Sequence, residues 1–306
     1  MRVRLIGVPF NSSGRGNGVA LAPAALRRAG LLARLAAVVE AGDASDVDVG
    51  AMTPQRSPRS GLLAEQALLT AIQHTREAVA AVHEFSSFPL VLGGDCPVML
   101  GCLAATRDRY GSVGLVMVDG HEDGYPPRQS LTGEAADSEL FLALGLPADG
   151  LPEELTTLTP LLHPGQVSLL GPRDEATIAR DGVASLRGTV PMHSDVEVIV
   201  RGPSAVAAQA ARDVQASAEH WWLHVDLDVL ATKQLSAVDY PQPGGLTWPQ
   251  LSELTAAVLA VPGCVGWTVA IYNPDLDRDA RQAHRIVDYI ASMVPAIGAR
   301  QEGTIS

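Results

Sequence analysis

The chain has 306 residues, of which 47% are apolar and 18% are charged, and 34 acidic against 22 basic residues give a net charge of -12. This composition excludes a disordered chain and predicts a large core. Because an acidic surface repels phosphate groups and Lys233 is the only lysine, we expect no nucleic-acid or anionic-membrane partner. Three widely spaced cysteines argue against a disulfide framework, and no apolar run reaches membrane-spanning length, so we expect a cytoplasmic protein.

Apolar runs of strand length alternate with longer segments of helical periodicity along the chain. The expected strands are residues 3–7, 90–93, 113–119, 167–171, 222–226 and 265–271. The clearest expected helices are residues 23–37, 62–84, 247–260 and 280–292, and the segment 53–61, rich in proline, serine and glycine, is expected to be a surface loop. This alternation predicts an α/β fold with a parallel sheet between layers of helices, in one domain spanning residues 1–306.

Three of the expected strands end abruptly in acidic, histidine or cysteine residues. They end in Asp95-Cys96, in Asp119-Gly120-His121-Glu122-Asp123 and in Asp226-Leu227-Asp228. Parallel α/β folds bind ligands at the carboxyl ends of their strands, and residues two apart in an extended chain share a face, so we expect these side chains to converge. Carboxylates so close together would repel one another unless cations lay between them, so the joint pattern predicts a dinuclear metal centre.

Each motif taken singly has a simpler explanation. An Asp-x-Asp pair after a strand often caps a helix or lies in a solvated turn. A cysteine after two glycines is often a small packed residue, and a loop histidine often only donates a hydrogen bond. The metal interpretation depends on all three motifs occurring in this order, each at the end of an expected strand.

The three motifs resemble the Gly-Gly-Asp-His, Asp-Ala-His-x-Asp and Asp-x-Asp signatures of the ureohydrolase superfamily, which includes arginase, agmatinase and formimidoylglutamase. The likeness extends over nearly the whole chain, through Gly7-Val8-Pro9, Ala22-Pro23, Pro243-Gly244-Gly245-Leu246 and Asn273-Pro274. The resemblance implies a three-layer αβα sandwich around a mostly parallel sheet of about eight strands. It also implies a homo-oligomer (a trimer, hexamer or dimer) and two divalent metal ions, with Mn²⁺ expected first.

The resemblance further implies which residues bind the metals. One ion would be bound by Cys96, Asp119, Asp123 and Asp226, and the other by His121, Asp119, Asp226 and Asp228. The two ions would activate a shared water molecule for attack on the central carbon of a guanidinium-like group, which releases urea or a substituted urea and an amine. Asp228 and Asp123 are the candidate catalytic residues, with Asp228 as the partner of that water.

Cys96 departs from the family pattern, which usually has histidine at this position. A thiolate can bind a metal but is a softer ligand, so Zn²⁺ or Fe²⁺ becomes an alternative to Mn²⁺. Within the family, a cysteine here resembles the branch that hydrolyses Nω-hydroxy-arginine, which points to hydroxyguanidines as substrates. The alternative is that Cys96 only packs, in which case one metal site is weak or empty.

Ile271 stands where arginase-like members place a glutamate that pairs with the substrate guanidinium. An apolar side chain cannot form a charge-assisted pair, so we do not expect plain arginine to be the substrate. Glu122 and Glu134 are candidate substrate-binding acids in its place, and for each the alternative is a solvated loop residue. Ala136 stands where arginase has a proton-shuttling histidine; His224, two residues before Asp226, is interpreted as a packed strand residue, so the shuttle stays unassigned.

These observations predict a binuclear, metal-dependent amidinohydrolase acting on a small guanidino or hydroxyguanidino compound other than arginine. Two alternatives stay open. One is an enzyme of the same fold that hydrolyses a formimino or amide C–N bond. The other is a catalytically weakened protein with a binding role, because two residues of the arginase pattern are missing.

Overall fold

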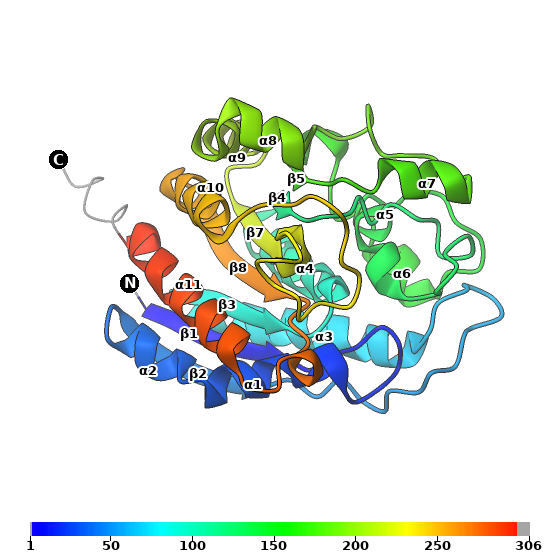
Figure 1. The fold of residues 1–306 in the computed structure, drawn as a ribbon. Helices are drawn as coiled ribbons and strands as arrows, with labels where there is room; N and C mark the ends of the chain where they lie inside the picture. Colours follow the sequence, from blue (N-terminus) through cyan, green and yellow to red (C-terminus); the bar gives the residue numbers. More distant parts are fainter. Residues whose placement is uncertain (1, 299–306) are drawn as a thin grey trace.

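The computed structural model describes residues 2–298, which form eight strands and eleven α-helices (Figure 1). The strands are β1 (Arg2–Val8), β2 (Glu40–Asp46), β3 (Phe88–Gly93), β4 (Gly114–Val118), β5 (Val167–Gly171), β6 (Met192–Ser194), β7 (Trp221–Asp226) and β8 (Cys264–Ala270). The helices are α1 (Ala22–Arg28), α2 (Leu31–Ala36), α3 (Glu65–Glu84), α4 (Met99–Tyr110), α5 (Glu139–Ala143), α6 (Glu153–Leu158), α7 (Glu175–Asp181), α8 (Asp195–Arg201), α9 (Pro203–Ser217), α10 (Trp248–Ala260) and α11 (Arg281–Gly298).

All eight strands belong to one sheet in the order β2-β1-β3-β8-β7-β4-β5-β6, and every pairing between them is parallel. The six strands expected from the sequence are present. The two edge strands were not predicted, because β6 has three residues and β2 is a polar, largely exposed segment. Arg27, whose guanidinium lies 2.7 Å from the Asp43 carboxylate, helps to hold β2 against the rest of the molecule.

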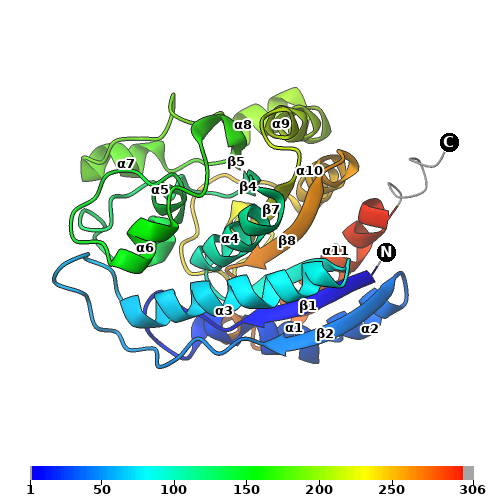
Figure 2. The ribbon, with the colours of Figure 1, turned by 180° about the vertical axis from the view of Figure 1, so that it is seen from behind.

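Helices cover both faces of the sheet and give the predicted three-layer αβα sandwich. Figure 1 shows α1, α2, α10 and α11 on one face, and Figure 2 shows α3 and α4 on the other. The alternation of side chains along the strands serves both layers: in β1, Val3 and Leu5 belong to one apolar core, whereas Ile6 and Val8 belong to the other. The fold class predicted from the sequence is therefore confirmed.

The predicted helices lie where we expected them, but their boundaries differ from the predicted ones. The helix expected over residues 23–37 is two helices, α1 and α2, because Gly30 adopts a φ of 90° between them. Thr247 caps α10 as expected. Its hydroxyl accepts the N–H of Gln250, and the Gln250 side chain accepts the N–H of Thr247. We did not predict α4, because residues 99–106 are all buried and the helix therefore lacks the polar face whose spacing indicates a helical period. No helix within residues 2–298 has both the length and the hydrophobicity to cross a bilayer.

The topology brings the three motifs to one place. The neighbouring central strands β3, β8, β7 and β4 are parallel, so their carboxyl ends lie side by side at one edge of the sheet. The loops after β3, β4 and β7 carry the three motifs, and the loop after β8 begins at Ile271. In open α/β sheets this edge is where ligands bind.

Candidate metal centre

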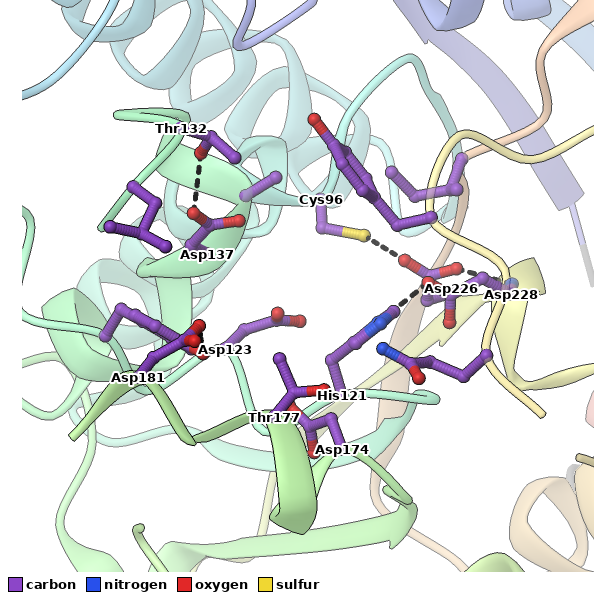
Figure 3. Close-up of a pocket in the computed structure, with 16 residues that line it drawn as sticks. Cys96, His121, Asp123, Thr132, Asp137, Asp174, Thr177, Asp181, Asp226 and Asp228 are labelled. Atoms are coloured by element: carbon purple, nitrogen blue, oxygen red, sulfur yellow. Dashed lines mark hydrogen bonds and ion pairs between the residues drawn. The ribbon is translucent and has the colours of Figure 1, made fainter. Parts of the chain in front are cut away.

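The three motifs surround a pocket with a volume of about 200 Å³. Five of the six expected metal ligands line it, namely Cys96, His121, Asp123, Asp226 and Asp228. The sixth, Asp119, is fully buried among them, with one oxygen close to potential ligand atoms of its neighbours. In Figure 3, Asp226 and Asp228 lie on one side of the pocket and Asp137 and Asp181 on the other.

The loop after β3 holds Cys96 against the end of β7. Asp95 fixes this loop because its carboxylate accepts hydrogen bonds from the backbone N–H groups of Ser12 (2.8 Å) and Cys96 (3.2 Å). Gly94 is required here, since a Cβ atom would lie 2.0 Å from the carbonyl oxygen of Phe10. As a result, the Cys96 thiol donates to Oδ2 of Asp226 at 2.9 Å.

The two acidic motifs converge through tight turns, not through the extended chain that we expected. After β7 the chain enters a 3₁₀ turn, in which the Asp228 N–H donates to Oδ1 of Asp226 at 2.6 Å. Oδ1 of Asp228 in turn accepts the N–H of Gly120 at 3.0 Å, which ties the second motif to the third. Asp123 has a φ of 46°, a sparsely populated conformation that turns its side chain back toward the pocket.

His121 forms two ion pairs at the pocket: its Nδ1 lies 2.9 Å from Oδ2 of Asp228 and 3.7 Å from Oδ1 of Asp119. Burial alone would lower the pKa of His121, but Asp228 and Asp119 raise it well above its usual value. Burial would likewise raise the pKa of Asp228, but the charges of His121 and Arg173 lower it below its ordinary value. Asp228 therefore stays ionised, as a base or metal ligand must.

The pKa values of the other carboxylates of the cluster are raised, whereas that of Asp228 is lowered. Burial and the charge of Asp228 raise the pKa of Asp119 to about 6. Burial and neighbouring carboxylates raise the pKa values of Asp123 and Asp226 well above normal, and burial with Asp226 does the same to the Cys96 thiol. In addition, Oδ2 of Asp119 is buried without a hydrogen-bond partner. A cluster with this much uncompensated negative charge fits divalent cations, and its carboxylate, imidazole and thiol donors are ordinary ligands for them.

Glu122 is not brought to the pocket, although we expected it as a substrate-binding acid. Its carboxylate is almost fully buried and accepts hydrogen bonds from the Ser185 hydroxyl (2.8 and 2.9 Å) and the Leu186 N–H (2.7 Å). The side chain thus fastens the loop around residue 185 instead of facing the substrate.

Replacing Glu122 by glutamine is expected to lower the free energy of unfolding by about 1–3 kcal/mol, because the Leu186 N–H loses a charged acceptor. Urea unfolding measures this loss, and metal analysis should show an unchanged metal content. A rise in KM with no loss of stability would instead restore Glu122 as a substrate contact.

The remaining substrate-binding candidates lie at different distances from the pocket. Ile271 lines it directly, with a φ of 71° that is strained for a β-branched residue. Glu134 meets the pocket wall only through Tyr240, whose hydroxyl donates to it at 2.9 Å, and burial raises the pKa of Glu134 to about 7. Ala136 also lines the pocket, so no histidine occupies that position.

The structure adds one site residue that we had missed, Glu139, and places His224, which we interpreted as a packed strand residue, next to the expected ligands. Glu139 and His224 are fully buried beside the expected ligands: Glu139 groups with Asp119 and Asp123, and His224 groups with Cys96 and Asp119. Both ring nitrogens of His224 lack a hydrogen-bond partner, and burial lowers its pKa to about 3. Its position two residues before Asp226 on a strand had already indicated that the two side chains share a face. No pattern in the sequence pointed to Glu139.

Comparisons with known proteins place the chain in a family. The sequence model of the arginase family matches residues 1–294. Arginase from Bacillus caldovelox is 27% identical over 299 residues, which cover 95% of this chain and 97% of that protein. Arginase from Staphylococcus aureus (strain MRSA252) is 31% identical over 175 residues, covering 56% of this chain and 57% of that protein, so the matched region spans little more than half of that relative.

Solved structures agree with these sequence matches. The native structure of arginase from Bacillus caldovelox is similar with a TM-score of 0.82 and 26% identity, covering 95% of this chain and 97% of that chain. Formimidoylglutamase from Bacillus subtilis subsp. subtilis str. 168 has a TM-score of 0.75 and 18% identity, covering 97% of this chain and 87% of that chain, and this likeness concerns the fold alone. Because the family match covers nearly the whole described chain, the protein belongs to the arginase family.

Proposed function

We propose that this protein is a binuclear metal-dependent hydrolase that cleaves a C–N bond in a guanidino or hydroxyguanidino compound other than arginine. The observation that carries the proposal is the convergence of six potential ligands at one pocket in a chain of the arginase family. The proposed ligands are Cys96, Asp119, His121, Asp123, Asp226 and Asp228. Mn²⁺ is the expected metal, and the thiol of Cys96 makes Zn²⁺ or Fe²⁺ the alternatives to test.

The charges in the pocket indicate which role each group has in the proposed reaction. Two bound divalent ions supply Lewis acidity and lower the pKa of water, which makes a nucleophile available near neutral pH. Asp228 is the proposed proton acceptor, because it stays ionised at the pocket, 2.9 Å from the imidazole of His121. Asp123, on the same pocket surface, is the second proposed catalytic carboxylate.

The wall of the pocket supports a substrate that is cationic away from the reacting group. Asp137, Asp174 and Asp181 all line the pocket, together with two tyrosines, and its lining includes no lysine or arginine among the described residues. One carboxylate oxygen of Asp174 is buried without a hydrogen-bond partner. At the metal end, Ile271 offers no charge to a guanidinium, so a less basic hydroxyguanidine is the better fit there.

A substrate panel tests the proposal. The Mn²⁺-loaded protein is incubated with alkylguanidines that carry an amine, with hydroxyguanidines, with arginine and with formimino compounds, and urea, hydroxyurea, formamide and ammonia are measured. Release of urea or hydroxyurea from a compound other than arginine supports the proposal. Formamide or ammonia alone would favour the formimino or amide alternative, and fewer than two metals per chain with no turnover would favour a binding role.

Replacing Ile271 by glutamate is expected to raise kcat/KM for guanidinium substrates about tenfold relative to hydroxyguanidines, since a hydrogen bond to a charged group contributes about 1.5–3 kcal/mol. The comparison is between kcat/KM ratios of the two substrate classes. Ile271→Gln is the matched control, because it adds polarity and similar size without charge. An equal gain in both variants would contradict the electrostatic explanation.

A further inference from the structure

Glu139 is a fully buried acid that the metal centre described above does not use. It is the first residue of α5, and its side chain is fully buried. One of its carboxylate oxygens lies within 4.8 Å of an oxygen of Asp119 and an oxygen of Asp123, which are themselves within that distance of each other. Three carboxylates from two different segments thus meet at one point in the core.

No cationic side chain compensates the charge of Glu139 among the groups that act on it. Both carboxylate oxygens are buried, and neither has a hydrogen-bond partner of normal geometry among the described residues. Burial and the charges of Asp119 and Asp95 raise its pKa, and contributions from Asp123 and its own backbone N–H offset this only in part. A buried carboxylate without a counter-charge is strongly unfavourable, so such a group is retained where a cation binds.

We propose that Glu139 is a further ligand of the metal ion that Asp119 and Asp123 bind. This inference rests on the metal centre of the proposed function, and it does not depend on the substrate. With Cys96, Asp119, Asp123 and Asp226, Glu139 would give that ion five protein ligands. Four of the five are carboxylates, and hard oxygen ligands favour Mn²⁺ over Zn²⁺ despite the cysteine.

The test is the variant Glu139→Gln, studied by metal content and by electron paramagnetic resonance of the Mn²⁺-loaded protein. The wild type is expected to retain two Mn²⁺ per chain with the signal of a coupled pair. Glu139→Gln is expected to retain one, with the signal of an isolated ion and an affinity at the second site lower by at least about 100-fold, because even outer-shell partners account for 10–100-fold. Two tightly bound, coupled ions in the variant would overturn the proposal.

Thermal unfolding separates a ligand from a structural residue. Without metal, Glu139→Gln is expected to unfold at a higher temperature than the wild type, because the repulsion between Glu139 and Asp119 is gone. With Mn²⁺ the order should reverse. Ser138→Ala is the matched control, since Ser138 is the buried neighbour whose hydroxyl also lacks a partner; an equal loss of metal in this variant would reduce the effect to packing and overturn the proposal.

The outcome for Glu139 is distinguishable from the outcome for the reaction. A wild type that holds two coupled Mn²⁺ ions but hydrolyses no member of the substrate panel would refute the proposed function and leave the Glu139 assignment to its own test. An active enzyme whose Glu139→Gln variant binds metal normally would refute the Glu139 assignment and leave the proposed function intact. Glu139→Asp, which keeps the charge on a shorter side chain, should retain more of the second ion than Glu139→Gln.

Discussion

Replacing Asp119 by asparagine is expected to abolish the binding of both metal ions and to lower kcat/KM at least about 1000-fold, because a Lewis acid supplies several kcal/mol of transition-state stabilisation. Asp119 takes part in all three groups of potential ligand atoms found among the described residues. Oδ1 accepts the His121 N–H at 2.8 Å, and Oδ2 is buried without a partner. Asparagine keeps the shape and the first contact but loses the charge that two ions would share.

Metal analysis and steady-state kinetics on the same preparation measure this effect. Asp181→Asn is the matched control, because Asp181 also lines the pocket but belongs to none of the three ligand groups. It should retain both ions, whatever its effect on KM. An Asp119→Asn variant that keeps two metals per chain would show that Asp119 does not bridge the ions.

Removing the metals is expected to make the stability of the protein strongly dependent on pH. The folded-state pKa of Asp119 is raised from 3.8 to about 6, and those of Asp123, Asp226 and Glu139 are raised well above their ordinary values, chiefly by burial. An acid with a raised pKa binds its proton more tightly in the folded state, so its contribution is present at low pH and is lost as the pH rises. The metal-free protein should therefore lose stability as the pH rises from about 4 to 6, and it should continue to lose stability above pH 6.

The ion pair of His121 and Asp228 does not alter this window. The pKa of Asp228 is lowered below 3.8, so its contribution is lost only at more acidic pH, and the pKa of His121 is raised well above 6.5, so its contribution is complete below that pH and is lost only as the pH rises above it. Urea unfolding at several pH values with a chelator measures the effect. Mn²⁺ at about 1,000 times its Kd should restore roughly 4 kcal/mol at neutral pH. A metal-free protein whose stability rises from pH 4 to pH 7 would contradict the charge assignment.

Much of the architecture was predictable because its signals are local. A strand buried on both faces is a short apolar run, and the motifs that follow β3, β4 and β7 are visible without any knowledge of contacts. Parallel pairing then brings their carboxyl ends together by necessity. The edge strand β2 was not predictable in this way, since its polar residues form a strand only because β1 offers backbone hydrogen bonds and Arg27 holds Asp43.

The side chains around the pocket show the limit of such reasoning. Glu122 lies between two expected ligands in the sequence but turns toward Ser185 and Leu186, because the chain bends where it leaves β4. Glu139 has no motif and begins an apolar helix, yet it meets Asp123 in the core. Proximity in sequence specifies direction only while the backbone is regular.

By itself, the sequence determined the α/β fold, because apolar runs of strand length alternate with helical segments, and its three motifs at strand ends supplied the six candidate metal ligands through their resemblance to a known family. Only the tertiary structure decided which other groups join them, because it sets the direction of side chains in loops and the distances between segments far apart in the chain. It removed Glu122 from the pocket and placed Glu139 and His224 beside the ligands. It also set the charge of the centre, since burial and the neighbouring carboxylates are properties of the folded chain.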